Sequence, residues 1–513
     1  MNISRISAIF VLLLCVAYTG CGQNSSSTEN ASDYNTENSF IDVQSYGAIG
    51  DGITDDTAAI QNAINSERNV YLPSTSAYYK ITSPLTLSSN SSLTGDGIRS
   101  QIRQVTSNAN VINGIGVNDI LIAGLDIYGP GDAFADATGN GIYLAGSSRV
   151  HIEGNKFENI GNTGIHLKDT TYSQIIENEM VSFIHYRQDS ADIALKYSSS
   201  YNIVRGNKCT SGTGVGILVQ AIALGDTANN NIVENNLVTA HDRYGIILYA
   251  RNGATAADVI GNKVIGNTVK NISDVTGTYF GAGIYAQGVR QTIIANNHVE
   301  NTNNGTTVEL LAPGGIGVTG SSDVIVTGNT VKNAKWYGIT VRDPFGIGGH
   351  YTVSDNTVSG SGKSGIYSIL AKKVKINGNT VSGGNSHGIC LYSTSGSSDA
   401  QILGNTLISN AQTGINSIGY NHTSIKDNIA RYNGIHGIAI QSSTEVEIEG
   451  NHVYGNGVRG IDINTGNSFV IVKGNIAEFN NYGIVRNSES NPVTFIDNIS
   501  SGNATFNWLN VPI

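Results

Sequence analysis

Asparagine recurs at a nearly constant spacing through the C-terminal half of this chain of 513 residues. The "GN" and "DN" steps place it at Asn329, Asn356, Asn379, Asn405, Asn428, Asn451, Asn475 and Asn498, which are 27, 23, 26, 23, 23, 24 and 23 residues apart. Each interval contains two stretches of alternating apolar and polar residues, such as "HGIAIQ" and "EVEIEGN". Alternation predicts short strands with one buried face. A chain with this repeat is expected to fold as a stack of similar units.

The period and the short strands favour an all-β fold, a single-stranded right-handed parallel β-helix. The same pattern extends back through "VHIEGN", "SQIIEN" and "YNIVRGN", and predicts roughly fourteen or fifteen coils between about residues 100 and 505. Glycine, of which there are 62, permits tight corners, and successive asparagines are expected to form a ladder. A leucine-rich repeat is excluded by the missing leucine frame, and a propeller is excluded by the period.

The interior of each coil is predicted from the "GI" steps. We expect one column of inward isoleucines, with the second and fourth positions of each strand alternating to the outside. The members of this column are Ile142, Ile165, Ile193, Ile217, Ile246 and Ile284.

The segment before the repeats, 41–100, is interpreted as an N-terminal cap and the first coils, and 101–513 as the β-helix. Asp56 is expected to cap a helix whose apolar face is Ala59, Ile60, Ala63 and Ile64. "IDVQSYGAIGDGITDDTAAIQNAI" followed by "VYLP" resembles the segment that opens many β-helical polysaccharide enzymes of the pectate-lyase superfamily, tailspikes and mannuronan epimerases. The resemblance implies a helix that closes one end of the stack. Asp51 and Asp55 are interpreted as turn residues of this segment.

The first residues, 1–20, are interpreted as a secretory signal, because the apolar run after Arg5 is too short to span a membrane. Gly20-Cys21 resembles a bacterial lipobox, although Tyr18 stands where such boxes usually have Leu. The resemblance implies cleavage before Cys21, lipidation of its thiol and anchoring to a membrane of the cell envelope. An ordinary secretory signal is the alternative. Residues 21–40 are polar and are expected to act as a flexible tether.

Two further observations limit the possible partners. Cys209 and Cys390 lie several predicted coils apart, beyond disulfide reach, so both are expected to be structural thiols. The formal net charge is −10, and a uniformly acidic surface repels nucleic acid and other polyanions. We therefore expect no nucleic-acid partner, and an anionic ligand requires local positive charge.

Local positive charge is predicted on one outer face of the stack. Outward positions of successive coils lie about 4.8 Å apart, like the residues of an extended polymer. The first eight coils carry cationic and aromatic side chains at these positions, together with amides, whereas those read from the later coils (Tyr367, Tyr392, Asn416, Gln441 and Asn464) are neutral. The members of this strip are Tyr143, His166, Lys168, Lys196, Gln220, Tyr249, Arg251, Tyr285, Gln287 and Arg342.

The residue types in this strip favour uronate chemistry. No outward carboxylate pair suitable for a glycosidase is found. In a uronate, a cation neutralises the carboxylate and a base removes the C5 proton. Protonation of the leaving O4 then gives a lyase, and reprotonation of C5 gives an epimerase. We expect Lys196, Tyr249 and His166 to be catalytic and the other members of the strip to bind substrate.

The coil "DIALKYSSSYNIVRGN" resembles the lysine coil of β-helical lyases of polysaccharide lyase family six, which act on alginate and dermatan. The resemblance implies that Lys196 is the base and that Asp192 binds calcium. The acid and the lysine differ from that pattern by one residue in register, and Gln220 stands where the family has Arg. Alginate lyases of family thirty-one imply a Lys/Tyr pair instead. The mannuronan epimerase motif "YGFDPH" is absent.

Calcium is expected near Asp192, Asp189 and Glu177, whose oxygens flank the lysine coil. Lys196 is interpreted either as a base or carboxylate clamp, or as a solvated surface charge. The sequence thus predicts an exported polysaccharide lyase that acts on an anionic uronate polymer, with alginate as the preferred substrate. A C5-epimerase and a non-catalytic glycan-binding β-helix are the alternatives.

Overall fold

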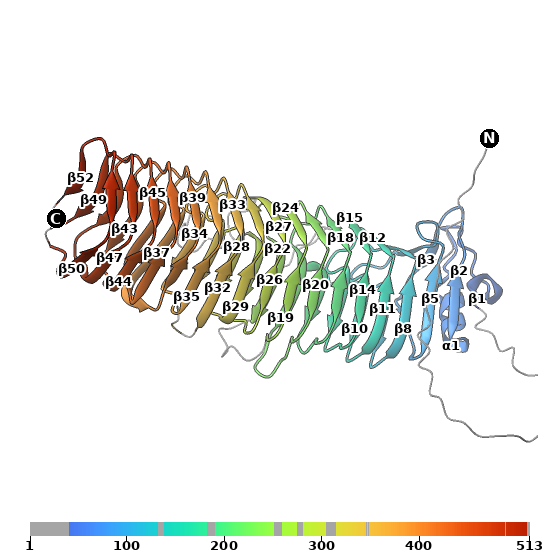
Figure 1. Ribbon diagram of the computed structural model, residues 1–513. Coiled ribbons are helices and arrows are strands. Elements are labelled where there is room, and N and C mark those ends of the chain that lie inside the picture. Colours follow the sequence, from blue (N-terminus) through green and yellow to red (C-terminus); the bar gives the residue numbers. More distant parts are fainter. Residues whose placement is uncertain are drawn as a thin grey trace, which may run out of the picture. The chain divides into compact units, whose positions relative to one another are not determined.

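The computed structural model describes residues 40–509, apart from 132–137, 182–189, 251–258, 274–280, 304–313, 345, 347 and 488, and apart from the side chains of 303 and 395–398. Within these residues, successive short strands belong in turn to three parallel sheets (Figure 1). Sheet A has 18 strands, from β1 (Ile41–Asp42) to β50 (Val493–Ile496). Sheet B extends from β3 (Tyr79–Ile81) to β51 (Ile499–Ser501), and sheet C from β4 (Leu85–Thr86) to β52 (Phe506–Leu509). Every strand pairs in parallel with the equivalent strand of the next coil, which confirms the predicted parallel β-helix.

The inward isoleucine column is confirmed. In sheet C, Ile142 of β10 (Ile142–Ala145) is in register with Ile165 of β13 (Ile165–Lys168), and Ile165 with Ile193 of β16 (Ala191–Lys196). The column continues to Ile217, Ile246 and Ile284, and all six side chains are fully buried in one continuous core.

The predicted asparagine ladder is also present, at the turn that follows each strand of sheet A. From Asn155 to Asn475, each side-chain Nδ2 donates to the Oδ1 of the next asparagine along the stack, ending at Asn498, at 2.9–3.0 Å. Most members also donate to a backbone carbonyl, so the amides satisfy one another in the interior.

The helix α1 (Thr57–Ser66) packs Ile60, Ala63 and Ile64 into the core at the N-terminal end of sheets A and C (Figure 1). One detail of its prediction is wrong. Asp56 occupies the N-cap position, but its carboxylate accepts from the backbone N–H groups of Ile49 and Gly50 and not from the helix. In the described residues, no helix is long and apolar enough to cross a membrane.

Glycine is required at one corner of each coil, where sheet B leads into sheet C. A Cβ at Gly216 would lie 2.4 Å from Val238, and one at Gly245 would lie 2.3 Å from Val269. Asp192 occupies the same position one coil before Gly216, because Ile193 is in register with Ile217. It faces Cys209, which takes the place of Val238 and is smaller than valine. Cys209 and Cys390 are both buried free thiols, as predicted.

Candidate functional site

The predicted strip contains one continuous row of side chains, here called the outer row. It crosses seven adjacent strands of sheet C: β13, β16, β19 (Val215–Ala221), β22 (Tyr244–Ala250), β25 (Ala282–Gln287), β28 (Ile316–Thr319) and β31 (Ile339–Arg342). Neighbouring members lie in direct register, about 4.8 Å apart. The members are Lys168, Lys196, Gln220, Tyr249, Gln287, Thr319 and Arg342.

A second row lies beside the outer row, two residues earlier on each strand. It begins with Tyr143 and His166, whose rings meet edge to face with centroids 5.2 Å apart. It continues with Ala194, Leu218 and Ile247, which are apolar. At His166 both rows carry polar side chains. On the next three strands only the outer row does.

The expectation of a flat, exposed strip is wrong over the middle strands. Lys196 is only 7% exposed, and Gln220 is 2% exposed. The apolar side chains of the second row belong to a separate buried cluster with Tyr285, outside the main core. Strands buried on both faces have nearly continuous apolar sequences, and "ADIALK", "VGILVQA" and "YGIILYA" have this form. That signal, and not the inward column, is what could have predicted the burial.

Several polar atoms along the two rows are buried and have no hydrogen-bond partner among the described residues. They are both ring nitrogens of His166, Oε1 of Gln220, Oγ1 of Thr319 and Nε of Arg342. Buried polar groups are nearly always hydrogen-bonded, and an unpaired one costs about 1–3 kcal/mol. A line of such groups on one face is typical of a surface that receives polar ligand atoms.

His166 is held neutral by its surroundings. Burial, together with the positive charges of Lys196 and Lys168, lowers the pKa of its imidazole to about 3. The imidazole is therefore neutral near neutral pH and lies close to two lysines. A general base works best when its pKa lies near the working pH, so His166 can act as one only where a bound anion raises this pKa.

Exposed aromatic rings lie at the end of the same strands. The Nζ of Lys168 lies 4.7 Å from the centroid of the Tyr197 ring. Tyr172 and Tyr201, in the turns between sheets C and A, stack with centroids 5.0 Å apart and planes at 10°, and they are 60% and 49% exposed. Sequence reasoning named Tyr172, with Tyr143 and Tyr249, as a possible partner of Lys196 in a Lys/Tyr pair, but it did not identify the stack with Tyr201, because both residues lie outside the strands that the repeat predicts.

At the other end of the outer row, Arg342 lies among tyrosines. Burial lowers the pKa of the Arg342 guanidinium, and the phenols of Tyr285, Tyr367 and Tyr337 oppose this effect. Tyr337 and Tyr367 stack with ring centroids 4.4 Å apart. The Tyr285 hydroxyl donates to Oε1 of Gln287 at 2.9 Å. Tyr249 and Gln287 are half-buried members of the row.

Asp192 and Glu177, two of the three residues predicted to bind calcium, do not face one another. Asp192 points into the coil, where its Oδ2 lies 2.9 Å from Nε2 of His241, and both side chains are fully buried. Glu177 is exposed in the turn after β14 (Gln174–Ile176). In the described part of the chain, no three His, Cys, Asp or Glu residues lie close enough to hold a metal ion. Asp192 also cannot orient Lys196, which lies on the opposite face of β16. Asp189, Arg251 and Cys21 lie outside the described residues.

Charged side chains also lie on the later coils of sheet C, at positions other than the five neutral ones that the sequence analysis identified. Nε2 of His436 lies 3.6 Å from Oδ2 of Asp462, and Arg459 donates to the other carboxylate oxygen at 2.7 Å. His387 contacts Asn416 at 3.3 Å, and burial lowers its pKa to about 4. His387, His436 and Arg459 precede the "GI" steps and were therefore not read as outward positions. Their contacts are mutual, so we interpret them as structural.

Comparisons with known families divide the chain into overlapping segments. Residues 40–264 match the family described as rhamnogalacturonase A/epimerase, pectate lyase-like, which includes the N-terminal half of the outer row. Residues 365–509 match a right handed beta helix region, and 261–424 match the periplasmic copper-binding protein NosD. The fold is thus a right-handed parallel β-helix of the kind found in polysaccharide-active proteins. A comparison with curated protein sequences finds no match.

One solved structure supports the same fold, and two others are similar at lower TM-scores. The pre-mature gene product 12 of bacteriophage phi29 is 12% identical, with a TM-score of 0.50, and the match covers 91% of this chain and 73% of that one. PfbA, a surface adhesin of Streptococcus pneumoniae, is 15% identical over 84% of this chain and 93% of its own, with a TM-score of 0.44. The A-module of the Azotobacter vinelandii mannuronan C-5 epimerase AlgE6 is 15% identical over 90% and 99%, with a TM-score of 0.35.

Proposed function

We propose that this protein is a polysaccharide lyase that cleaves a uronate-containing polymer, with alginate as the preferred substrate, by β-elimination. One observation carries the proposal: a neutral, buried imidazole with both nitrogens unpartnered lies beside Lys168 and Lys196, at the start of a polar row on a β-helix. The pectate lyase-like match over residues 40–264 supports a polysaccharide as the substrate class.

The proposed roles follow from the charges. Lys168 binds the uronate carboxylate and neutralises it, which makes the C5 proton acidic. His166 accepts that proton, and the electrons form the C4–C5 double bond as the C4–O4 bond breaks. Lys196 donates a proton to the departing O4. The bound carboxylate offsets the repulsion between the two lysines and the imidazolium, so it raises the pKa of His166 when the base is needed.

The remaining members of the rows bind the polymer. Gln220, Tyr249 and Gln287 offer hydrogen bonds to sugar hydroxyls along the outer row, and Arg342 offers a second carboxylate site. Tyr143, Tyr172 and Tyr201 provide aromatic faces for sugar rings. Because neighbouring strands lie about 4.8 Å apart, these groups can contact successive sugar units of one extended chain.

The test is incubation of the purified protein with alginate, polygalacturonate and glucuronan. Lyase action produces unsaturated ends, which absorb in the ultraviolet, and it shortens the chains. A proton spectrum that changes without chain cleavage would instead identify a C5-epimerase. Binding with neither change would identify a non-catalytic glycan-binding protein, a function favoured by the burial of Lys196. Activity that survives in both His166→Gln and Lys168→Ala would refute the proposed mechanism.

We also infer that the protein is exported and anchored at the cell envelope through a lipid on Cys21. The inference depends on the apolar run before Gly20-Cys21. Radiolabelled palmitate should be incorporated into the wild type and not into Cys21→Ser, which should appear in the soluble fraction. A calcium requirement remains a prediction, and activity with EDTA, followed by calcium addition, measures it.

A further inference from the structure

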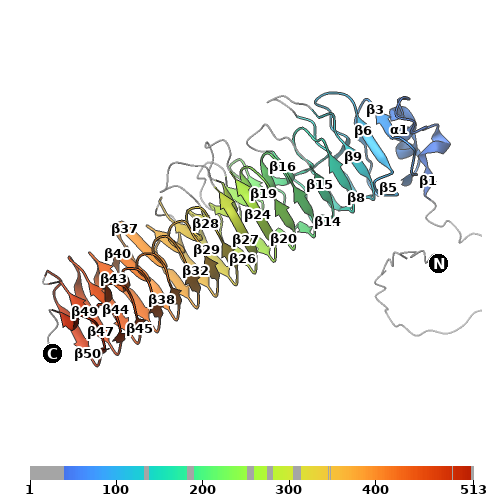
Figure 2. The same cartoon turned by 90° about the horizontal axis from the view of Figure 1, so that it is seen from above.

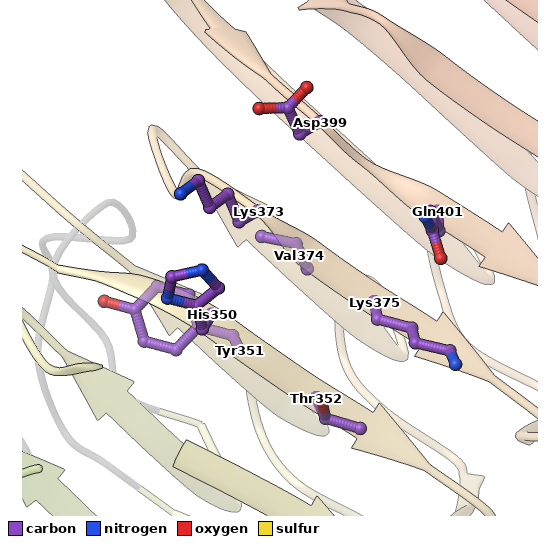
Figure 3. A pocket seen from close by; sticks show the side chains of 8 residues that line it. All are labelled: His350, Tyr351, Thr352, Lys373, Val374, Lys375, Asp399 and Gln401. Carbon is purple, nitrogen blue, oxygen red and sulfur yellow. The ribbon is translucent and has the colours of Figure 1, made fainter. Parts of the chain in front are cut away.

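A shallow groove of about 360 Å³ lies on the outer face of sheet A, away from the two rows on sheet C. It spans the adjacent strands β32 (Gly349–Ser354), β35 (Val374–Asn377) and β38 (Gln401–Leu403). Figure 3 shows the side chains of three successive coils arranged around it; those with polar ends are His350, Thr352, Lys373, Lys375, Asp399 and Gln401. Figure 2 shows β32 and β38 along the same side of the stack, and β35 pairs with both of them.

The lysines of this groove differ from other lysines of the same sheet. Lys426 pairs with Glu447 and Glu449 at 2.6 and 2.8 Å, and Lys473 pairs with Glu449 at 2.9 Å. Lys373 and Lys375 are exposed and make no ion pair among the residues that the structure describes.

The surroundings of these two lysines leave them positive. The register neighbours of Lys375 are Thr352 and Gln401, which are neutral. Lys373 lies level with His350 and Asp399 on the two adjacent strands, and His350 lies 3.5 Å from Asp323. The lining thus has two lysines and one carboxylate, that of Asp399. In a chain of net charge −10, the groove is therefore a local positive site.

The shape of the groove suits a sugar chain. Its floor is the backbone of the three strands, because Tyr351 and Val374, which also line it, are buried with their side chains in the core of the coil. The polar groups are repeated on strands about 4.8 Å apart, which matches an extended polymer better than a compact ligand.

We propose that this groove is a second, non-catalytic site that binds the carboxylates of a uronate polysaccharide through Lys373 and Lys375, with hydrogen bonds from Thr352 and Gln401. The proposal goes beyond the lyase activity and does not require it. A site of this kind holds a polymer on the surface while another part of the same polymer occupies sheet C. It also increases the effective concentration of substrate at the catalytic rows.

The test compares Lys373→Ala/Lys375→Ala with the matched control Lys426→Ala/Lys473→Ala, which removes the same charge from the same sheet. The probe is a mannuronate hexamer, and affinity is measured by calorimetry. We expect the first variant to bind about tenfold or more weakly and the control to bind within about twofold of the wild type. Equal affinity of the first variant and the wild type would overturn the proposal.

Lysine acylation followed by mass spectrometry locates the site separately. The hexamer should protect Lys373 and Lys375 and leave Lys426 reactive, whereas neutral cellohexaose should protect neither. Equal protection by a sulfated oligosaccharide or by a single-stranded oligonucleotide would show a non-specific polyanion patch and refute the uronate site. If the hexamer protects Lys373 and Lys375 but no uronate polymer is cleaved, the proposed lyase function is refuted and the binding site is not.

Discussion

His241 and Asp192 form a fully buried pair in the interior of the β-helix, with Nε2 and Oδ2 2.9 Å apart. The two side chains meet beside Gly212, a residue of the coil between them. A Cβ at Gly212 would lie 2.7 Å from the His241 ring. Asp192 also approaches Cys209 and raises the pKa of its thiol, as does burial of the thiol. The residue that the sequence placed at the active site therefore belongs to the packing of the core.

Substitutions of Asp192 and of Cys209, which it contacts, should have effects on stability that are not additive. Asp192→Gly leaves Nε2 of His241 buried without its partner, and we expect a loss of about 2 kcal/mol. Cys209→Val crowds the Asp192 carboxylate and should cost about 2 kcal/mol. The double variant should cost less than the sum, because it recreates the contact between Gly216 and Val238. Denaturant unfolding of the four proteins measures the coupling, and strict additivity would contradict it.

Stability should depend on pH through His166. An unfolded imidazole titrates near 6.5, whereas the pKa of folded His166 is about 3. Between these values the unfolded chain binds a proton that the folded chain does not, so stability falls as pH decreases, by about 1.4 kcal/mol per pH unit. His166→Gln should flatten this slope in urea unfolding. His350→Gln, at an exposed site, should leave the slope unchanged.

Lys196 should be required for turnover. Lys196→Met retains most of the side-chain volume but has no proton to donate, and we expect activity to fall at least about a hundredfold. Lys196→Arg should also fail, since a guanidinium keeps its proton. Because Lys196 is 7% exposed, melting temperatures must accompany the rates. Exposed Lys263→Met is the control, and full activity of a folded Lys196→Met would return the residue to a structural role.

Substitution of an asparagine in the middle of the ladder should lower the stability of the protein. Asn329 donates to Asn356 and to the carbonyl of Ile294, and its Oδ1 accepts from Asn297. Asn329→Ala leaves several buried groups unpaired, and we expect a loss of about 3 kcal/mol. The control is Asn385→Ala, an exposed residue outside the ladder whose φ is not positive, with an expected change within about 0.5 kcal/mol. Similar values for the two variants would show that the ladder contributes little.

The stacked tyrosines should affect binding and not chemistry. Tyr172→Ala/Tyr201→Ala removes two exposed rings, and we expect KM for the polymer to rise about tenfold with kcat nearly unchanged. Steady-state kinetics on polymer and on short oligomers measures KM and kcat separately. Tyr432→Ala, at another exposed ring, is the control. A fall in kcat at unchanged KM would assign the pair to a different role.

The repeat was predictable because each coil obeys the same alternation, so Ile142 to Ile284 and Asn329 to Asn498 could be placed from spacing alone. The order of the outer row followed from the same alternation. The burial of the outer row could not be predicted in this way. Alternation shows that Lys196 points outward, but it does not show whether other residues cover that side chain. Asp192 was misread because its partners, Cys209 and His241, are 17 and 49 residues away in sequence. The Lys373 groove has no motif at all, since it arises from three coils together.

The asparagine ladder has a consequence for how such a chain can change its length. Each ladder Asn bonds the equivalent Asn of the adjacent coil and nearby backbone carbonyls, so no contact in the ladder depends on how many coils the chain contains. Removal of 405–427 would leave Asn379 facing Asn428 with the same donors and acceptors. Duplication or deletion of a whole coil therefore keeps the ladder intact, whereas insertion of a single residue within a strand turns the side chains of the rest of that strand to the opposite face. The outer face of sheet C can thus become longer or shorter by whole coils while Lys168 and His166 keep their neighbours.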